Sequence, residues 1–194
     1  MHKPQIILAS ASPRREQLLR EMRLPFRVVR PDGVEEVSAG AAPEVLAMQN
    51  AQLKARAVAG RHPDSIVIGA DTIVVLNGKI FGKPSNHDEA MKMLEQLVGR
   101  QHQVMTAVCL IHRSLDMEIT FADTTRVWMR ALTREQIGEY FSKINPLDKA
   151  GAYAAQEHGN TIIERVEGSY SNVVGLPAER LRATLEKLGM IGDA

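Results

Sequence analysis

One stretch of sequence decides the fold: Ile66-Val67-Ile68-Gly69-Ala70-Asp71-Thr72-Ile73-Val74-Val75-Leu76-Asn77-Gly78-Lys79-Ile80-Phe81. Residues 65–70 form an apolar run that predicts a strand, and residues 72–76 continue that strand. Asn77-Gly78 is a strong short-range signal for a hairpin, so residues 79–81 are predicted to be the return strand. A long strand that ends in a hairpin places a sheet at the centre of the fold.

Further strands and helices alternate on both sides of this stretch. We expect strands over residues 5–9, 26–29, 103–112, 117–129 and 161–166, and helices over 13–22, 43–60, 133–144, 177–188 and from Asn86 onward. The segment 30–42 contains proline and glycine without a clear period, which predicts a functional loop. The mixture of helices and hairpins indicates an α/β fold with a mixed central sheet flanked by helices.

The composition is that of an ordinary globular protein. The chain has 194 residues, 44% hydrophobic and 24% charged, with no repeat or linker to divide it, so we expect one domain over residues 1–194. Lys and Arg total 24 against 23 Asp and Glu, a net charge of +1 that does not suggest a nucleic-acid binder. No apolar run approaches the roughly 20 residues of a membrane helix, and residues 6–9 are too short for a signal-peptide core. We therefore expect a cytoplasmic protein that binds neither nucleic acid nor membrane.

The first polar segment that suggests chemistry is Ser10-Ala11-Ser12-Pro13-Arg14-Arg15. It begins a predicted helix, where free backbone N–H groups attract anions. Positive arginines in the first turn oppose the helix dipole, a conflict that a phosphate-bearing ligand would resolve. The alternative is that Ser12 only caps the helix and that the arginines face solvent. This segment alone leaves both possibilities open.

Other charged side chains lie at positions that are typical of sites. Asp71, beside Thr72, follows a hydrophobic strand, where α/β proteins place metal ligands or bases; a turn aspartate facing water fits equally well. Lys83 lies in Gly82-Lys83-Pro84, which lacks the residues of a Walker A loop. Glu35 and Glu36 alone indicate a solvated acidic pair. The single cysteine, Cys109, lies in an apolar run and excludes an internal disulfide and a multi-cysteine zinc site.

Five segments resemble, in order and spacing, the motifs of the Maf family of nucleoside triphosphate pyrophosphatases. They are residues 10–15, 69–72, 82–84, 148–153 and 173–177. The resemblance implies a two-lobed α/β structure around a substrate cleft, like that of inosine triphosphatases, and often a homodimer. It also implies metal-dependent hydrolysis of a nucleoside triphosphate to the monophosphate and pyrophosphate.

The resemblance assigns roles to the charged residues. Asp71 is expected to be the catalytic base or a metal-bound carboxylate, and Glu36 supplies the second carboxylate. Hard oxygen ligands together with a phosphate substrate favour Mg²⁺ or Mn²⁺. The side chains expected to contact phosphate oxygens are Ser10, Arg15, Lys54 and Lys83. For Lys149, a phosphate contact and a pairing with Asp148 both remain open.

The selection of the base is assigned in the same way. Arg14, Thr72 and Gln156 match the positions used for base selection by the branch of the family that acts on dTTP and UTP. The branch that acts on methylated guanine nucleotides carries tryptophan in place of Arg14. The Gln156 carboxamide holds both a donor and an acceptor, so it can match the polar edge of a pyrimidine.

Two residues depart from the family pattern. Leu53 precedes Lys54 where glutamate is usual, which affects a polar contact near Lys54. Glu157 follows Gln156 where glycine is usual, which affects the shape of the base pocket. The alternatives are a regulatory nucleotide-binding protein that affects cell division, and the same chemistry on methylated or deaminated nucleotides. A base and an acidic loop favour the enzyme.

Overall fold

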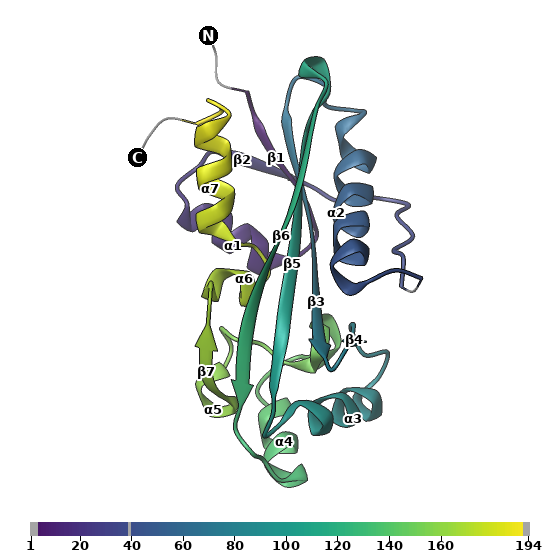
Figure 1. The fold of residues 1–194 in the computed structure, drawn as a ribbon, viewed down its shortest axis with the longest axis vertical. Coiled ribbons are helices and arrows are strands. Elements are labelled where there is room, and N and C mark those ends of the chain that lie inside the picture. The colour runs from purple at the N-terminus through teal and green to yellow at the C-terminus, as the bar shows by residue number, and fades with distance from the viewer. Residues whose placement is uncertain (1–3, 39, 192–194) are drawn as a thin grey trace. The chain divides into compact units, whose positions relative to one another are not determined.

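The structure is a computed structural model that describes residues 4–38 and 40–191. Strands and helices alternate along much of the chain (Figure 1). The strands are β1 Ile6–Ala9, β2 Phe26–Val29, β3 Ile66–Leu76, β4 Lys79–Phe81, β5 Gln101–His112, β6 Met117–Met129 and β7 Ile163–Glu167. The α-helices are α1 Pro13–Glu21, α2 Pro43–Ala59, α3 His87–Leu97, α4 Arg134–Phe141, α5 Gly159–Ile162, α6 Tyr170–Val174 and α7 Ala178–Lys187. Short 3-10 segments are η1 Arg113–Leu115, η2 Pro146–Asp148 and η3 Ala150–Ala152.

The strands form one mixed sheet in the order β2-β1-β3-β5-β6-β7, with β4 paired to β3. β1 runs parallel to both of its neighbours, whereas β4 pairs antiparallel to β3 and β7 pairs antiparallel to β6. β5 and β6 are adjacent and joined by η1, a connection short enough only for an antiparallel hairpin. The predicted fold class, α/β with a mixed central sheet flanked by helices, is confirmed.

The chain divides into two compact units, each assembled from segments that are distant in sequence. The first unit comprises Met1–Asp71, Thr106–Asp123 and Gly175–Ala194, and the second comprises Thr72–Met105 and Thr124–Val174. The division falls within β3, between Asp71 and Thr72, so this strand contributes to both units. A single domain over residues 1–194 and a substrate cleft stay predictions.

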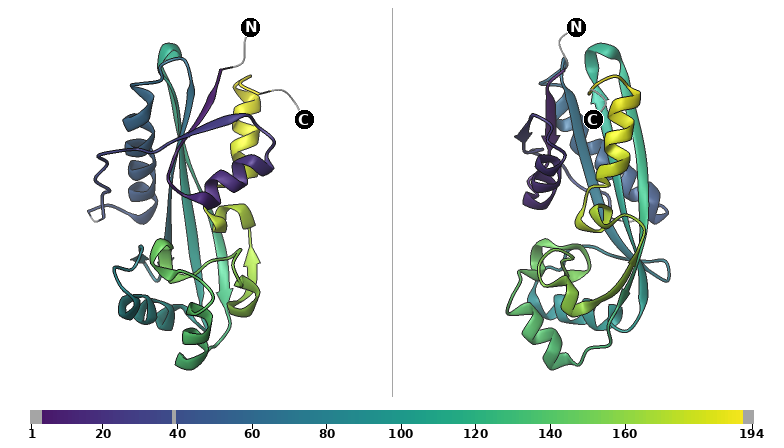
Figure 2. Two further views of the ribbon diagram at one scale, coloured as in Figure 1. Left: turned by 180° about the vertical axis from the view of Figure 1, so that it is seen from behind. Right: turned by 90° about the vertical axis from the view of Figure 1, so that its left-hand side faces the viewer.

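In the first unit, helices lie on both sides of the strands. α2 lies on one side, while α1 and α7 lie on the other (Figures 1 and 2). β3 and α2 approach closely at Gly69, where a Cβ would lie 2.3 Å from the Ala51 carbonyl oxygen and 2.6 Å from the Ala55 backbone nitrogen. No side chain larger than hydrogen fits there without moving the helix. Gly69 therefore sets the distance between β3 and the helix that carries Lys54.

The second unit is built around its own apolar core, to which α3 and α4 contribute Leu94, Leu97, Ile137 and Tyr140. α4 begins at Thr133 with a complete capping box. At the start of α3 the predicted capping box forms only in part. The Asn86 side chain accepts from the Glu89 backbone nitrogen at 2.8 Å, but the Glu89 carboxylate accepts from the Ser85 backbone and hydroxyl instead of the Asn86 backbone.

The predicted strands and long helices are confirmed with shifts of up to about three residues at their ends. α5 and α6 were not expected, and the first residues of the strand predicted at 161–166 belong to α5. None of the described helices is long and apolar enough to cross a membrane. Cys109 is buried, and burial raises the pKa of this thiol to about 11, which disfavours a nucleophilic thiolate.

Candidate active site

Lys54 lies between two carboxylates in the first unit. Its Nζ donates to Asp71 Oδ1 at 2.6 Å and lies 2.7 Å from Glu36 Oε1. The side chains of Lys54 and Asp71 are only 12% and 8% exposed, whereas that of Glu36 is 51% exposed. A buried carboxylate needs a partner, and Lys54 supplies it for Asp71. Glu36 meets the same ammonium from the solvent side.

Three different elements bring these side chains together. Asp71 lies on β3, two residues beyond the close approach at Gly69, and Lys54 lies on the helix that packs there. Glu36 comes from the loop between β2 and α2. The alternative of Asp71 as a solvent-facing turn residue is therefore wrong. The alternative of a merely solvated acidic pair is wrong for Glu36, which pairs with Lys54.

Asn50 also belongs to this site, although the sequence alone did not indicate it. Its Oδ1 accepts from the Val37 backbone nitrogen at 2.8 Å, and its Nδ2 donates to the Val37 carbonyl oxygen at 3.0 Å. The same Nδ2 lies 3.4 Å from Asp71 Oδ2. One buried carboxamide thus ties the loop that carries Glu36 to α2 and contacts Asp71. The sequence feature that could have indicated Asn50 is its place in the helix, as a polar residue one turn before Lys54 and among alanines.

The start of α1 contributes Arg15 and Ser10. Arg15 Nε donates to the Gly175 carbonyl oxygen at 2.8 Å. Burial lowers the pKa of Arg15, and the nearby Arg14 lowers it further, while the charges of Asp71 and Glu36 oppose the shift. A guanidinium stays protonated despite such a shift, so Arg15 adds a fixed positive charge that interacts with both carboxylates.

Ser10 is buried, and its Oγ accepts from the Ser12 backbone nitrogen at 3.1 Å. Ser12 stands at the N-cap of α1, but its side chain makes no capping hydrogen bond. The alternative of Ser12 as a capping side chain is therefore wrong. Which of these groups contact phosphate stays a prediction, as does the role of Arg14.

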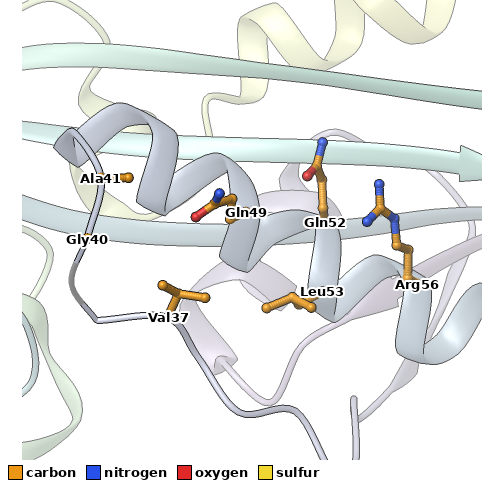
Figure 3. Close-up of a pocket in the computed structure, with 7 residues that line it drawn as sticks. All are labelled: Val37, Gly40, Ala41, Gln49, Gln52, Leu53 and Arg56. Carbon is orange, nitrogen blue, oxygen red and sulfur yellow. The ribbon is translucent and has the colours of Figure 1, made fainter.

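Leu53 projects from a different face of α2 than Lys54. It lines a pocket of about 420 Å³ together with Val37, Gly40, Ala41, Gln49, Gln52 and Arg56. Figure 3 shows Leu53 extending from the helix toward Val37. Lys54 still meets both of its carboxylates. The departure at Leu53 therefore leaves these two pairings of Lys54 in place.

In the second unit, Gln156 lines a separate pocket of about 350 Å³. The other lining residues are Ala155, Gly159, Asn160, Ile163 and Tyr170. Glu157 does not line it; its Oε2 lies 3.3 Å from Lys149 Nζ. Gln156 therefore lines this pocket even though the bulkier Glu157 follows it.

Lys149 is 4% exposed, and its Nζ also bonds to Asp148 Oδ1 and to the Asn145 carbonyl oxygen, both at 2.9 Å. Of the two readings left open by the sequence, the structure thus shows the pairing with Asp148. Thr72 and Lys83 belong to the second unit as well. Lys83 is exposed in the loop after β4, and the roles of both residues stay predictions.

The arrangement can hold and move a proton and can neutralise phosphate charge. Asp71 can accept a proton, and Lys54 and Arg15 can stabilise negative charge that develops nearby. Within residues 4–38 and 40–191, no group of three or more His, Cys, Asp or Glu side chains could hold a metal ion. A divalent cation here would rely on the two carboxylates together with water or ligand oxygens.

Fold and site define an α/β protein in which a lysine bridges two carboxylates beside the central strand. The chain belongs to the Maf-like protein family, whose model matches residues 5–188.

Curated relatives match nearly the whole chain. A protein of Akkermansia muciniphila named dTTP/UTP pyrophosphatase is 46% identical over 186 residues, which are 96% of this chain and 97% of that protein. A protein of the same name from Symbiobacterium thermophilum is 45% identical over 185 residues, 95% of this chain and 94% of that protein. The resemblance to the Maf family is confirmed.

Solved structures show the same fold in more distant proteins. The Staphylococcus aureus Ham1 protein matches with a TM-score of 0.56 at 18% identity, covering 95% of this chain and 99% of that chain. A HAM1 protein from Coxiella burnetii matches with a TM-score of 0.57 at 17% identity and the same coverage. These likenesses establish the fold alone.

Proposed function

We propose that this protein is a nucleoside triphosphate pyrophosphatase that hydrolyses dTTP and UTP to the monophosphate and pyrophosphate. The family match and the names of relatives that are 42–46% identical support this function. The observation that carries it is the Lys54 ammonium held within 2.7 Å of both Asp71 and Glu36. A regulatory protein that only binds nucleotide has no need of a buried carboxylate poised to take a proton, so the site favours the enzyme.

Hydrolysis between the α and β phosphates needs an activated water and neutralised phosphate charge. Asp71 is the proposed base or a metal-bound carboxylate. Lys54 Nζ donates to its Oδ1 at 2.6 Å, which holds the carboxylate in place. Phosphate oxygens are proposed to be bound by Ser10, Arg15, Lys54 and Lys83.

A divalent cation, Mg²⁺ or Mn²⁺, fits this donor set. Two carboxylates that reach one ammonium can also approach one cation, and Mg²⁺ in nucleotide sites is held by one or two carboxylates plus phosphates and waters. Asp71 and Glu36 would hold it, and it would supply positive charge on the phosphate oxygens. Chelation is expected to abolish turnover because the clustered carboxylates and phosphates then repel one another. Full activity after exhaustive chelation would contradict the metal requirement.

Base selection is proposed to involve Gln156, with Arg14 and Thr72. Among residues 4–38 and 40–191, no hydrogen-bond partner of the Gln156 carboxamide is found, so its donor and acceptor are available to a ligand in the pocket. A pocket of this kind rejects a mismatched base because its own polar groups are left unpaired. We further propose a cytoplasmic location and a homodimer.

Substitutions at Gln156 and Lys83 test this division of labour. Gln156→Ala is expected to reduce the ratio of kcat/KM for dTTP to that for dGTP. The loss of one polar partner corresponds to about 1–3 kcal/mol of discrimination between the two nucleotides. Lys83→Ala is expected to lower both values alike, since every triphosphate presents the same charge. The assignment is wrong if Gln156→Ala preserves the ratio and Lys83→Ala collapses it.

A further inference from the structure

The backbone just before Gln156 is held by a hydroxyl from another element. Tyr140, on α4, is 3% exposed. Its hydroxyl donates to the Ala154 carbonyl oxygen at 3.2 Å and accepts from the Ala154 backbone nitrogen at 2.9 Å. Burial raises the pKa of Tyr140 to about 12, so the hydroxyl keeps its proton at neutral pH. One side chain therefore satisfies both backbone groups of a residue two positions before Gln156.

The backbone just after Gln156 is held by an ion pair. Glu157 Oε2 lies 3.3 Å from the buried Lys149 Nζ, which is itself fixed by Asp148 and by the Asn145 carbonyl oxygen. A buried ammonium with several oxygen partners is a firm anchor, because losing partners leaves an uncompensated charge. Glu157 thus pairs with a buried ammonium, although its own side chain is 44% exposed.

Gln156 stands between these two anchors, and a third lies just before them. The Tyr153 hydroxyl lies 2.7 Å from the Nε2 of the buried His102. Residues 153, 154 and 157 are therefore tied to buried groups, while Gln156 lines a pocket of about 350 Å³. A loop that is fixed on both sides of a ligand-reading side chain loses less conformational freedom when the ligand binds.

We propose that Tyr140 and Glu157 are positioning residues that set base selectivity by holding the backbone on either side of Gln156. This inference rests on the proposed role of Gln156 in reading the base. Neither residue need touch the nucleotide. Tyr140 acts through the two hydrogen bonds to Ala154, and Glu157 acts through Lys149.

The test is a double-mutant cycle read out as selectivity. Tyr140→Phe keeps the ring and removes both bonds to Ala154, and it is expected to narrow the dTTP-to-dGTP ratio of kcat/KM by about three- to tenfold. Gln156→Ala is expected to lower the same ratio by about five- to 150-fold. In the Gln156→Ala background, Tyr140→Phe should narrow it no further, because the side chain that it positions is gone.

The matched control is Thr133→Ala at the N-cap of the same helix. Thr133 Oγ1 accepts from the Gln136 backbone nitrogen, so its loss weakens α4 without touching Ala154. This variant should unfold at a lower temperature and retain the wild-type ratio. An equal narrowing in Thr133→Ala would show that general loosening of the unit is responsible, which overturns the inference.

Glu157→Gln keeps the inference testable should Tyr140→Phe fail to fold. It alters a side chain that is 44% exposed and removes only the charge that faces Lys149, so the ratio is expected to narrow in the same direction. The inference is overturned if Tyr140→Phe and Glu157→Gln both keep the wild-type dTTP-to-dGTP ratio of kcat/KM while Gln156→Ala lowers it. That outcome leaves the proposed function intact. An unchanged ratio in Gln156→Ala itself contradicts the proposed base-reading role, and the inference falls with it.

Discussion

Replacing Gly69 by alanine tests how the fold holds the candidate site together. The added Cβ would lie 2.3 Å from the Ala51 carbonyl oxygen, 2.6 Å from the Ala55 backbone nitrogen and 2.8 Å from the Ala55 Cβ. Ordinary contact begins at 3.4 Å, so relief of the shortest contact requires a shift of 3.4 − 2.3 = 1.1 Å. Two of these atoms are backbone, so α2 itself must move away from β3.

Such a shift has two measurable consequences. Overpacking of this kind costs about 1–3 kcal/mol, which corresponds to a fall in Tm of roughly 2–12 °C for a chain of this size. Lys54 and Asn50 move with α2, whereas Asp71 stays on β3. A misplacement of about 1 Å in a catalytic group costs on the order of a hundredfold in rate. We therefore expect a lower Tm and a kcat/KM for dTTP reduced by about that factor.

Gly60→Ala is the matched control. The same methyl group is added at the C-cap of the same helix, where φ is −61° and nothing lies within 4 Å of the new Cβ. Thermal unfolding and pyrophosphate release should remain close to wild type, with a slight gain in stability. A Gly69→Ala protein with wild-type Tm and wild-type turnover would refute the argument that this contact positions the lysine.

Two further predictions concern single titratable groups. Asp71→Asn should lower kcat by about a hundredfold or more with a wild-type circular dichroism spectrum, since the amide keeps the shape but cannot take a proton; an active variant would move the base role elsewhere, with Glu36 next. Burial lowers the pKa of His102 from 6.5 to about 4. Between these pH values the imidazole is protonated in the unfolded chain but neutral in the folded one. The free energy of unfolding therefore decreases as pH falls from about 6.5 to about 4. The loss is on the order of 3 kcal/mol, and urea unfolding should show a shallower pH slope in His102→Phe than in wild type; equal slopes would show that His102 does not titrate differently on folding.

Much of the sheet could be predicted from the sequence because its signals are local. The apolar run before Asp71 and the Asn77-Gly78 turn specify β3 and β4 without reference to the rest of the chain. α5 and α6 could not be predicted, because helices of four and five residues are too short to show a period. Glu89 satisfies the capping-box pattern, yet its carboxylate is bound by Ser85, a choice that sequence spacing does not determine.

The residues of the candidate site were likewise predictable only in part. The resemblance to the Maf family singled out Asp71, Lys54 and Glu36, and the structure brings these three together. Asn50 could not be predicted, because the residues that it contacts lie 13 and 21 positions away along the chain. The pairing of Glu157 with Lys149 likewise depends on how the segment between them folds back. Local patterns indicate which elements form, whereas polar contacts between elements follow from their packing.

The most direct test of the proposed activity is the identity of the products formed from dTTP. Purified protein with Mg²⁺ or Mn²⁺ is incubated with dTTP and followed by ³¹P NMR, with Asp71→Asn prepared in parallel to exclude a contaminating hydrolase. The proposed cleavage between the α and β phosphates predicts equal amounts of dTMP and pyrophosphate from the wild type and almost none from Asp71→Asn. Formation of dTDP and orthophosphate, or equal product from both proteins, would contradict it.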